Sequence, residues 1–290
     1  MTTHSIKVIK KKTTPSLIRI REELISLDQP KIMGILNITE DSFYDGGKNN
    51  SLKKALNHTE KMIEEGATFI DIGVATSKPG STLIQPEKEL ELLLPFLSQL
   101  IKRFPNTHFS IDTYNSEVAK TSLDMGVSMI NDISGGILDP EMFEVVAQHP
   151  VPYVMMHMQG TPENMQLNPR YDNVVTDVSL FFSSQLKKAT NAGIQDVLID
   201  PGFGFGKKTE HNFQLLKNIS HLSMLKCPIL MGVSRKSMIY KTLEISPREA
   251  LNGTTALHAW GLERGVQILR VHDVKEAKEC IGLWSALQMF

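Results

Sequence analysis

One pattern recurs along the chain and constrains its fold more than any other feature. A stretch of helical character ends in glycine, a short apolar run follows, and the run ends in a polar side chain. Four copies are clear, at residues 64–73, 123–132, 191–200 and 263–272. Glycine in this place is typical of a helix end, where a left-handed backbone costs glycine little. The apolar runs are β-branched without strict alternation, as in strands buried on both faces of a parallel sheet.

Further apolar runs complete the set of predicted strands. They lie near residues 32–36, 68–72, 107–111, 127–131, 152–156, 196–200, 228–232 and 266–270. Helical patterns fill the gaps, for example over 86–104 and 210–226. This α/β order predicts a single (β/α)8 TIM barrel over residues 28–290, with an open doubly wound sheet as the alternative. Residues 1–27 precede the barrel and are expected to form a short N-terminal extension, either a hairpin or a tail.

Bulk properties exclude several classes of protein. The formal net charge is -1, so no field over the whole molecule favours nucleic acid or a membrane surface. No apolar run is long enough for a signal peptide or a membrane span. The two cysteines, Cys227 and Cys280, are too few for a disulfide framework and fit a reducing compartment. We therefore expect a soluble, cytoplasmic protein whose partners include neither nucleic acid nor a membrane.

Polar side chains stand where the predicted strands end, which is the end of such a barrel that carries active sites. They are Asn37, Asp71, Asp112, Asn131, His157, Asp200, the run Ser234-Arg235-Lys236 and the run Arg270-Val271-His272. At a single strand end, a polar residue is explained equally well by the strand reaching solvent. Over eight strands it indicates a binding rim, whose carboxylates and amides suit a ring with many donors and acceptors and whose cations suit an anion.

Three loops sharpen this interpretation, and two other signals have simpler explanations. The glycine-rich segment 200–212 leads to a helix start but fits neither a dinucleotide nor a phosphate-loop motif. Segment 232–239 turns from a strand into a helix, which favours an anion. Segment 37–47 is long and polar, as lids are. His157 lacks a second ligand at zinc spacing, and the methionines between 155 and 165 are expected to pack the barrel.

Eight successive segments resemble the signature blocks of dihydropteroate synthases. They are MGILNITEDSFYDGG, GATFIDIG with the following SKPG, SIDTYNSEVA, INDISGG, MMHMQGTPENMQ, IDPGFGFGK, GVSRKSMI and ILRVHDV, in order from Met33 to Val274. The resemblance implies a (β/α)8 barrel, usually a homodimer, that uses Mg2+. It also implies a transferase of folate biosynthesis, which joins 6-hydroxymethyl-7,8-dihydropterin pyrophosphate to p-aminobenzoate and releases pyrophosphate.

The same resemblance implies a role for each matching residue. The pterin-binding set is Asp112, Asn131, Met156, Asp200, Phe205 and Lys236. The pyrophosphate set is Asn37, Arg270 and His272, with Asn37 beside the metal. The p-aminobenzoate set is Phe43, Ser77, Lys78, Phe205 and Ser237, with Phe43 and Asp41 in a mobile first loop. Asp112, Asp200, Lys236 and Arg270 are the implied catalytic residues of a dissociative reaction without a covalent enzyme intermediate.

Three residues depart from the family pattern. Glu40 replaces a proline of the first loop, and Ser77 and Lys78 replace the usual threonine and arginine of the second. Lysine keeps the charge but lacks the two-pronged guanidinium. These changes fall in the region implied to bind the arylamine, so sulfonamide discrimination is the property expected to differ.

Two other functions fit part of the pattern. A methyltetrahydrofolate–corrinoid methyltransferase would share Asp112, Asn131 and Asp200 but would not need the SRKS and RVHDV segments. A non-catalytic pterin-binding homologue would explain the altered second loop but not the intact Asn37, Arg270 and His272. Pyrophosphate release from the two substrates distinguishes all three functions.

Overall fold

The computed structural model describes residues 17–38, 48–74 and 82–290, and its centre is a ring of parallel strands. Along the sheet these are β8 (Val197–Asp200), β7 (Tyr153–Met156), β6 (Met129–Asp132), β5 (His108–Asp112), β4 (Phe69–Gly73), β3 (Lys31–Asn37), β10 (Ile268–Val271) and β9 (Leu230–Met231). A parallel bridge between Ile199 and Ile229 joins the two edge strands. The predicted (β/α)8 barrel is therefore confirmed, and the open sheet is excluded.

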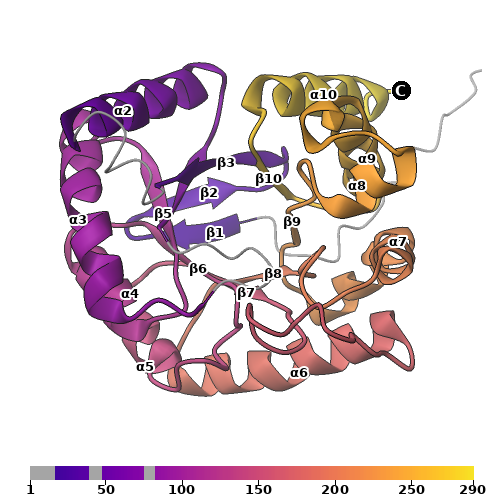
Figure 1. Ribbon diagram of the computed structural model, residues 1–290, viewed down its shortest axis with the longest axis horizontal. Helices are drawn as coiled ribbons and strands as arrows, with labels where there is room; N and C mark the ends of the chain where they lie inside the picture. The colour runs from indigo at the N-terminus through magenta and orange to yellow at the C-terminus, as the bar shows by residue number, and fades with distance from the viewer. Residues whose placement is uncertain (1–16, 39–47, 75–81) are drawn as a thin grey trace, which may run out of the picture.

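Helices surround the barrel, as Figure 1 shows. They are α2 (Lys48–Glu64), α3 (Pro86–Arg103), α4 (Ser116–Asp124), α5 (Met142–Ala147), α6 (Val174–Ala192), α7 (Thr209–Lys217), α8 (Ser237–Leu243), α9 (Leu251–Glu263) and α10 (Val274–Leu287), with short 3-10 helices at Ile219–Leu225 and Pro247–Glu249. One large apolar cluster fills the layer between helices and strands. None of the helices in the described ranges is long and apolar enough to cross a membrane.

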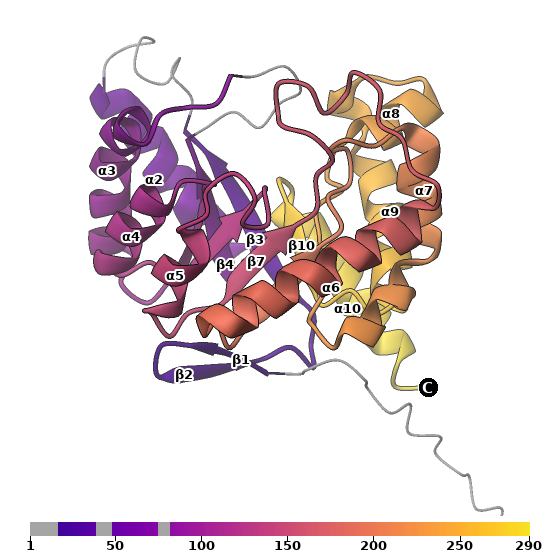
Figure 2. The same ribbon diagram turned by 90° about the horizontal axis from the view of Figure 1, so that it is seen from below.

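A hairpin of β1 (Leu17–Ile20) and β2 (Glu23–Ser26) lies across one end of the barrel (Figure 2). Ile18 and Ile20 are buried in a cluster with residues near the amino-terminal ends of the barrel strands, such as Met33 and Phe69. Arg21 donates its backbone N–H to the carbonyl of Pro150 at 2.7 Å. The hairpin thus closes the amino-terminal end of the barrel and leaves the opposite end for a binding site.

The glycines singled out in the sequence have the expected conformation. Gly66, Gly126, Gly193 and Gly265 all have positive φ, between 89° and 111°. The predicted helix over 210–226 is wrong in its second half, because α7 ends at Lys217 and a 3-10 turn follows. Asn218 lies at the break, where its side-chain amide donates to the Gln214 carbonyl at 2.8 Å. Asparagine commonly competes with the helical ladder in this way.

Two strands extend beyond the ends expected from their polar residues. β4 continues past Asp71 to Gly73, and β6 continues past Asn131 to Asp132. Since side chains alternate along a strand, Asp71 lies one layer deeper inside the barrel than a rim residue. Asp132 faces the opposite side of its strand, where it accepts from Tyr153 Oη at 2.6 Å.

Candidate active site

The strand register places the predicted rim residues side by side. Asn37 is paired with Gly73, Gly73 with Asp112, and Asp112 with Asn131, across four neighbouring strands. Gly73 has no side chain, so Asn37 and Asp112 face the same space. A Cβ at Gly73 would lie 3.6 Å from both Asn37 Oδ1 and Asp112 Oδ2.

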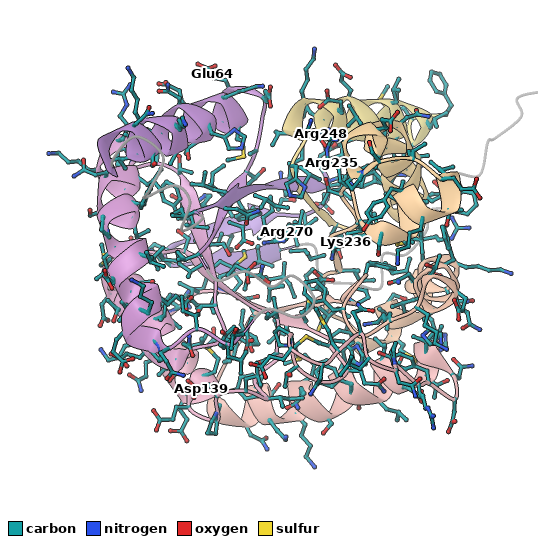
Figure 3. The ribbon with its side chains drawn as sticks, viewed as in Figure 1. Glu64, Asp139, Arg235, Lys236, Arg248 and Arg270 are labelled. Carbon is teal, nitrogen blue, oxygen red and sulfur yellow. The ribbon has the colours of Figure 1, made fainter. Side chains whose placement is uncertain are left out.

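Arg270 joins these strands from the centre of the barrel (Figure 3). Its Nε donates to Asp71 Oδ2 and its Nη2 donates to Asp112 Oδ2, each at 2.7 Å. Asn131 Nδ2 also donates to Asp71 Oδ2, at 2.9 Å. Asp71 is fully buried, and its other oxygen has no hydrogen-bond partner in the described structure. One guanidinium therefore fixes two carboxylates, and through Asp71 it fixes the amide of Asn131.

The charges of this network depend on one another. Burial raises the pKa of Asp112 to about 7, against the opposing effect of Arg270. Burial alone would lower the pKa of Arg270, but Asp71 and Asp112 outweigh it and raise that pKa. Arg270 is therefore a permanent cation, while Asp112 is a carboxylate that is easily protonated.

A second charged pair lies across the barrel on β8 and after β9. Asp200 Oδ1 accepts the backbone N–H of Gly202 at 2.8 Å, and the side chain is almost fully buried. Lys236 Nζ donates to the Phe203 carbonyl and lies 4.5 Å from the centre of the Phe205 ring. A Cβ at Gly232 would lie 3.7 Å from Asp200 Oδ2 and 3.9 Å from Lys236 Nζ. Gly232 thus keeps the space between these two groups open.

The pKa values of this pair are shifted toward the neutral forms. Burial raises the pKa of Asp200, and Lys236 opposes that shift. Burial lowers the pKa of Lys236 to about 8, while Asp200 opposes it. Each group is therefore held in its charged form chiefly by the other, and a ligand with ring N–H groups would find an acceptor beside a cation.

Apolar side chains cover the same mouth of the barrel. Met156 and Phe205 belong to one cluster with Tyr114, Met158 and Met165. The methionines of this region are buried, and Met156 pairs in register with Asp200. An apolar surface therefore lies next to hydrogen-bonding groups, which is the combination that a heteroaromatic ring requires.

His272, one of the predicted anion-binding residues, bonds to Ser234 at the rim. His272 Nδ1 lies 3.1 Å from Ser234 Oγ, which also accepts the His272 backbone N–H at 3.2 Å. Partial burial of the ring, followed by the nearby Arg270, lowers the pKa of His272 to about 4, so the ring is neutral at pH 7. Arg235 makes two hydrogen bonds to Asp273, at 2.8 and 2.9 Å. Arg235 therefore braces the rim, whereas Arg270 faces the interior.

The predicted arylamine-binding residues are only partly described. Ser237 is the first residue of α8, directly after Lys236, and Phe205 lies in the apolar cluster. Glu40, Asp41, Phe43, Ser77 and Lys78 lie outside the described residues.

The site-residue prediction missed two buried acids. Asp71 was recognised as a polar strand residue but not as the partner of Arg270; an acid inside the apolar run FIDIG was the available signal. Glu89 on α3 is also buried, and its Oε2 accepts from the Asn115 side-chain amide. Asn115 and Tyr114 in turn bond the backbone of Ile84, at 3.5 and 2.7 Å. No signal in the sequence marked Glu89, because its contacts arise from the packing of α3 against the start of α4.

Replacing Glu89 by glutamine should stabilise the protein more at pH 8 than at pH 5. Burial raises the pKa of Glu89 to about 7, so the folded protein binds this proton more tightly than the unfolded chain does. The wild type should therefore lose about 3 kcal/mol of unfolding free energy as the pH rises from the unfolded pKa of about 4.3 to about 7. Glutamine keeps the acceptor for Asn115 without a charge. Thermal unfolding of Glu89→Gln and of the exposed control Glu87→Gln is measured at both pH values. If the melting temperature of Glu89→Gln differs from wild type by the same amount at pH 5 and pH 8, the prediction is wrong.

Comparison with known proteins gives one consistent result. The model of the family described as pterin binding enzyme matches residues 33–272. Dihydropteroate synthase of Escherichia coli K12 is 41% identical over 264 residues, covering 90% of this chain and 93% of the relative. The corresponding enzyme of Haemophilus influenzae is 39% identical over the same length.

Solved structures agree in fold over nearly the whole chain. A Yersinia pestis dihydropteroate synthase with a sulfonamide drug has a TM-score of 0.88 at 39% identity, covering 94% of this chain and all of its own. The Xanthomonas albilineans enzyme with 4-aminobenzoic acid has a TM-score of 0.85 at 37% identity, with 94% and 99% coverage. The Thermus thermophilus enzyme with 6HMPPP has a TM-score of 0.81 at 33% identity, with 93% and 99% coverage. The chain belongs to the pterin-binding enzyme family and, within it, to the dihydropteroate synthases.

Proposed function

We propose that this chain joins 6-hydroxymethyl-7,8-dihydropterin pyrophosphate to p-aminobenzoate, giving 7,8-dihydropteroate and pyrophosphate. The observation that carries the proposal is the barrel mouth itself. Arg270 is bonded to Asp112 and, through Asp71, to Asn131, while Asp200 and Lys236 lie across the same opening. Related enzymes have been solved with 6HMPPP and with 4-aminobenzoic acid, which supports the same substrates here.

The residues of the mouth match the needs of a reaction in which the leaving group departs first. Asp112 and Asp200 accept from the amino and ring N–H groups of the pterin, and Asn131 both donates and accepts. The bond from the pterin methylene carbon to oxygen breaks, and pyrophosphate takes the electron pair. Arg270 stabilises this negative charge, and the two carboxylates stabilise the positive charge left on the pterin. The amine nitrogen then attacks the methylene carbon and loses a proton to solvent, without a covalent enzyme intermediate.

Mg2+ fits the oxygen atoms at the rim. Asn37 Oδ1 and Asp112 Oδ2 face the same space above Gly73. Within the described ranges no group of three or more His, Cys, Asp or Glu residues could hold a metal alone. This suits Mg2+, which prefers oxygen and takes most ligands from substrate phosphates and water. Asn37 would hold the ion. When bound, Mg2+ would neutralise charge on the pyrophosphate.

The test of this function is direct. Both substrates with Mg2+ should release pyrophosphate and form 7,8-dihydropteroate in equal amounts. Omitting p-aminobenzoate should abolish the formation of 7,8-dihydropteroate. Pterin binding without any product would support the non-catalytic homologue, and methyl transfer from methyltetrahydrofolate would support the corrinoid-dependent enzyme.

Restoring the family residues of the second loop should change arylamine selectivity. Lys78→Arg supplies a planar fork that matches a carboxylate, which p-aminobenzoate has and a sulfonamide lacks. We expect the ratio of sulfonamide Ki to p-aminobenzoate KM to rise about fivefold, on the order of 1 kcal/mol. Ser77→Thr, which adds only a methyl group, should change it less. Ratios that equal the wild-type value in both variants would contradict the proposed role of this loop.

We also infer a homodimer, joined through α9 and α10. Leu283 and Leu287 lie one turn apart on α10 and are 73% and 74% exposed, and Trp260 on α9 is 56% exposed. Exposed apolar side chains of this size favour burial against a second copy. Light scattering should give twice the monomer mass of 32.5 kDa, and Leu283→Glu should give monomers. A wild-type monomer at micromolar concentration would exclude the dimer.

A cytoplasmic location completes the proposal. Cys227 and Cys280 are both free thiols, and burial raises the pKa of each thiol. Unpaired cysteines fit a reducing compartment. Cell fractionation would test this location.

A further inference from the structure

Lys207 is a buried lysine to which the proposed reaction assigns no task. The side chain is 3% exposed and lies in the loop after β8. Its Nζ lies 3.0 Å from the carbonyl oxygens of both Gly202 and Phe205, 3.2 Å from that of His157, and 2.9 Å from His157 Nδ1. Burying an ammonium is costly unless its donors are satisfied. Four close partners satisfy them here, so the buried lysine joins the segments that carry these partners.

The partners divide into two groups, and Lys207 connects them. Gly202 and Phe205 belong to the loop that follows β8, whereas His157 directly follows Met156 at the end of β7. Three of the partners are carbonyl oxygens, which can only accept. An ammonium supplies three N–H donors, so its protonated form matches this cage. The His157 ring is held in turn by Phe181, edge to face at 4.8 Å.

The loop lies directly on the backbone that follows β7. A Cβ at Gly202 would be 1.9 Å from the His157 carbonyl oxygen, and a Cβ at Gly206 would be 2.5 Å from that of Gln159. Both glycines also have positive φ, 70° and 58°. Glycine is required at both positions, because any side chain would separate the two segments. The glycine-rich segment of the sequence therefore serves close contact between two strand ends.

The opposite side of this loop faces the substrate-binding mouth. Phe203 offers its carbonyl oxygen to Lys236 Nζ, and the Phe205 ring lies under the same ammonium. Asp200, at the start of the loop, accepts from Gly202. Three groups of the proposed pterin pocket, Asp200, Phe205 and Lys236, thus depend on a loop whose inner side is held by Lys207.

We propose that Lys207 is a positioning residue for pterin binding, which clamps the loop 201–207 to the end of β7 and so sets Asp200, Phe205 and Lys236 against the ring. This inference rests on the proposed function, since the ring is the pterin of that reaction. Lys207 acts through the loop and touches no reacting atom. Tyr171 helps from the outer side, where its hydroxyl donates to the Gly206 carbonyl at 2.7 Å.

Four proteins test the proposal: wild type, Lys207→Met, Tyr171→Phe and the control Lys208→Met. The control removes a lysine charge from the exposed residue directly after this loop. The dissociation constant of 6-hydroxymethyl-7,8-dihydropterin pyrophosphate is measured with Mg2+ and without p-aminobenzoate, well below the melting temperature of each variant. Steady-state kinetics then separate the pterin KM from kcat.

We expect the pterin dissociation constant to rise about 30-fold in Lys207→Met and about fivefold in Tyr171→Phe, equivalent to about 2 and 1 kcal/mol, and less than twofold in Lys208→Met. The pterin KM should rise in parallel, with kcat at saturation reduced less than threefold. A dissociation constant within twofold of wild type in folded Lys207→Met overturns the proposal. If that variant does not fold, the same result in Tyr171→Phe overturns it. Failure of the wild type to bind or turn over pterin would instead overturn the proposed function.

Discussion

Replacing Arg270 by methionine is expected to lower kcat/KM for the pterin pyrophosphate by about 10³-fold. Losing one preorganised donor to a developing anion typically costs about 10²- to 10³-fold, and Arg270 also holds Asp112 and, through Asp71, Asn131 in place. The upper end of that range is therefore expected. Steady-state kinetics at saturating p-aminobenzoate measure the loss.

The same substitution should also lower the stability of the fold. It leaves Asp71, which is fully buried, without its cation. Breaking a buried ion pair by removing one partner costs about 3–5 kcal/mol.

Two further variants separate charge from geometry. Arg270→Lys keeps the charge but cannot reach both carboxylates with a planar fork, so its loss of kcat/KM should be intermediate, about 30- to 100-fold. Arg264→Met removes a half-buried guanidinium that lies over Trp260, away from the barrel mouth. Its kinetics should match the wild type. A kcat/KM for Arg270→Met within tenfold of wild type would show that Arg270 does not stabilise the leaving group.

The fold was predictable because its signals are local and repeated. Gly193, with φ of 104°, ends α6, and the apolar run that follows it predicts the buried strand β8. The break at Asn218 was not predictable in the same way. The apolar periodicity continues through it, and the bond from the asparagine side chain to the Gln214 carbonyl is seen only in the structure.

The site was predictable where a side chain stands at a strand end, and less so behind it. Asp112, Asn131, Asp200 and Arg270 follow from topology, because all parallel strands deliver their carboxyl ends to one rim. The partner of Arg270 does not follow, since the choice of Asp71 depends on register and side-chain alternation across several strands. Lys207 was missed for another reason: in the sequence it is one of two adjacent lysines, and only the packing shows that Lys208 is exposed while Lys207 is buried.

Replacing Asp200 by asparagine is expected to weaken pterin binding about 100-fold, with little change in the fold. The asparagine Oδ1 can still accept the Gly202 N–H, which Asp200 accepts at 2.8 Å. The other oxygen becomes an NH2 group beside the space that Gly232 leaves open. There the NH2 group and the pterin N–H groups would both be donors, so neither could bond the other. Leaving such buried donors unsatisfied costs about 2–3 kcal/mol. Titration with the pterin pyrophosphate measures the change.

The matched control is Asp196→Asn, at the opposite end of the same strand. Asp196 directly precedes β8 and accepts the backbone N–H of Arg19 from the hairpin that closes the barrel. Its substitution removes the same charge from the same β/α unit, so pterin affinity should stay within twofold of wild type. Asp200→Asn also leaves the buried Lys236 without its main counter-charge, so both variants are titrated well below their melting temperatures. Weakened binding in folded Asp200→Asn but not in Asp196→Asn would assign Asp200 to the ligand, whereas equal affinities in the two variants would exclude it from the pterin pocket.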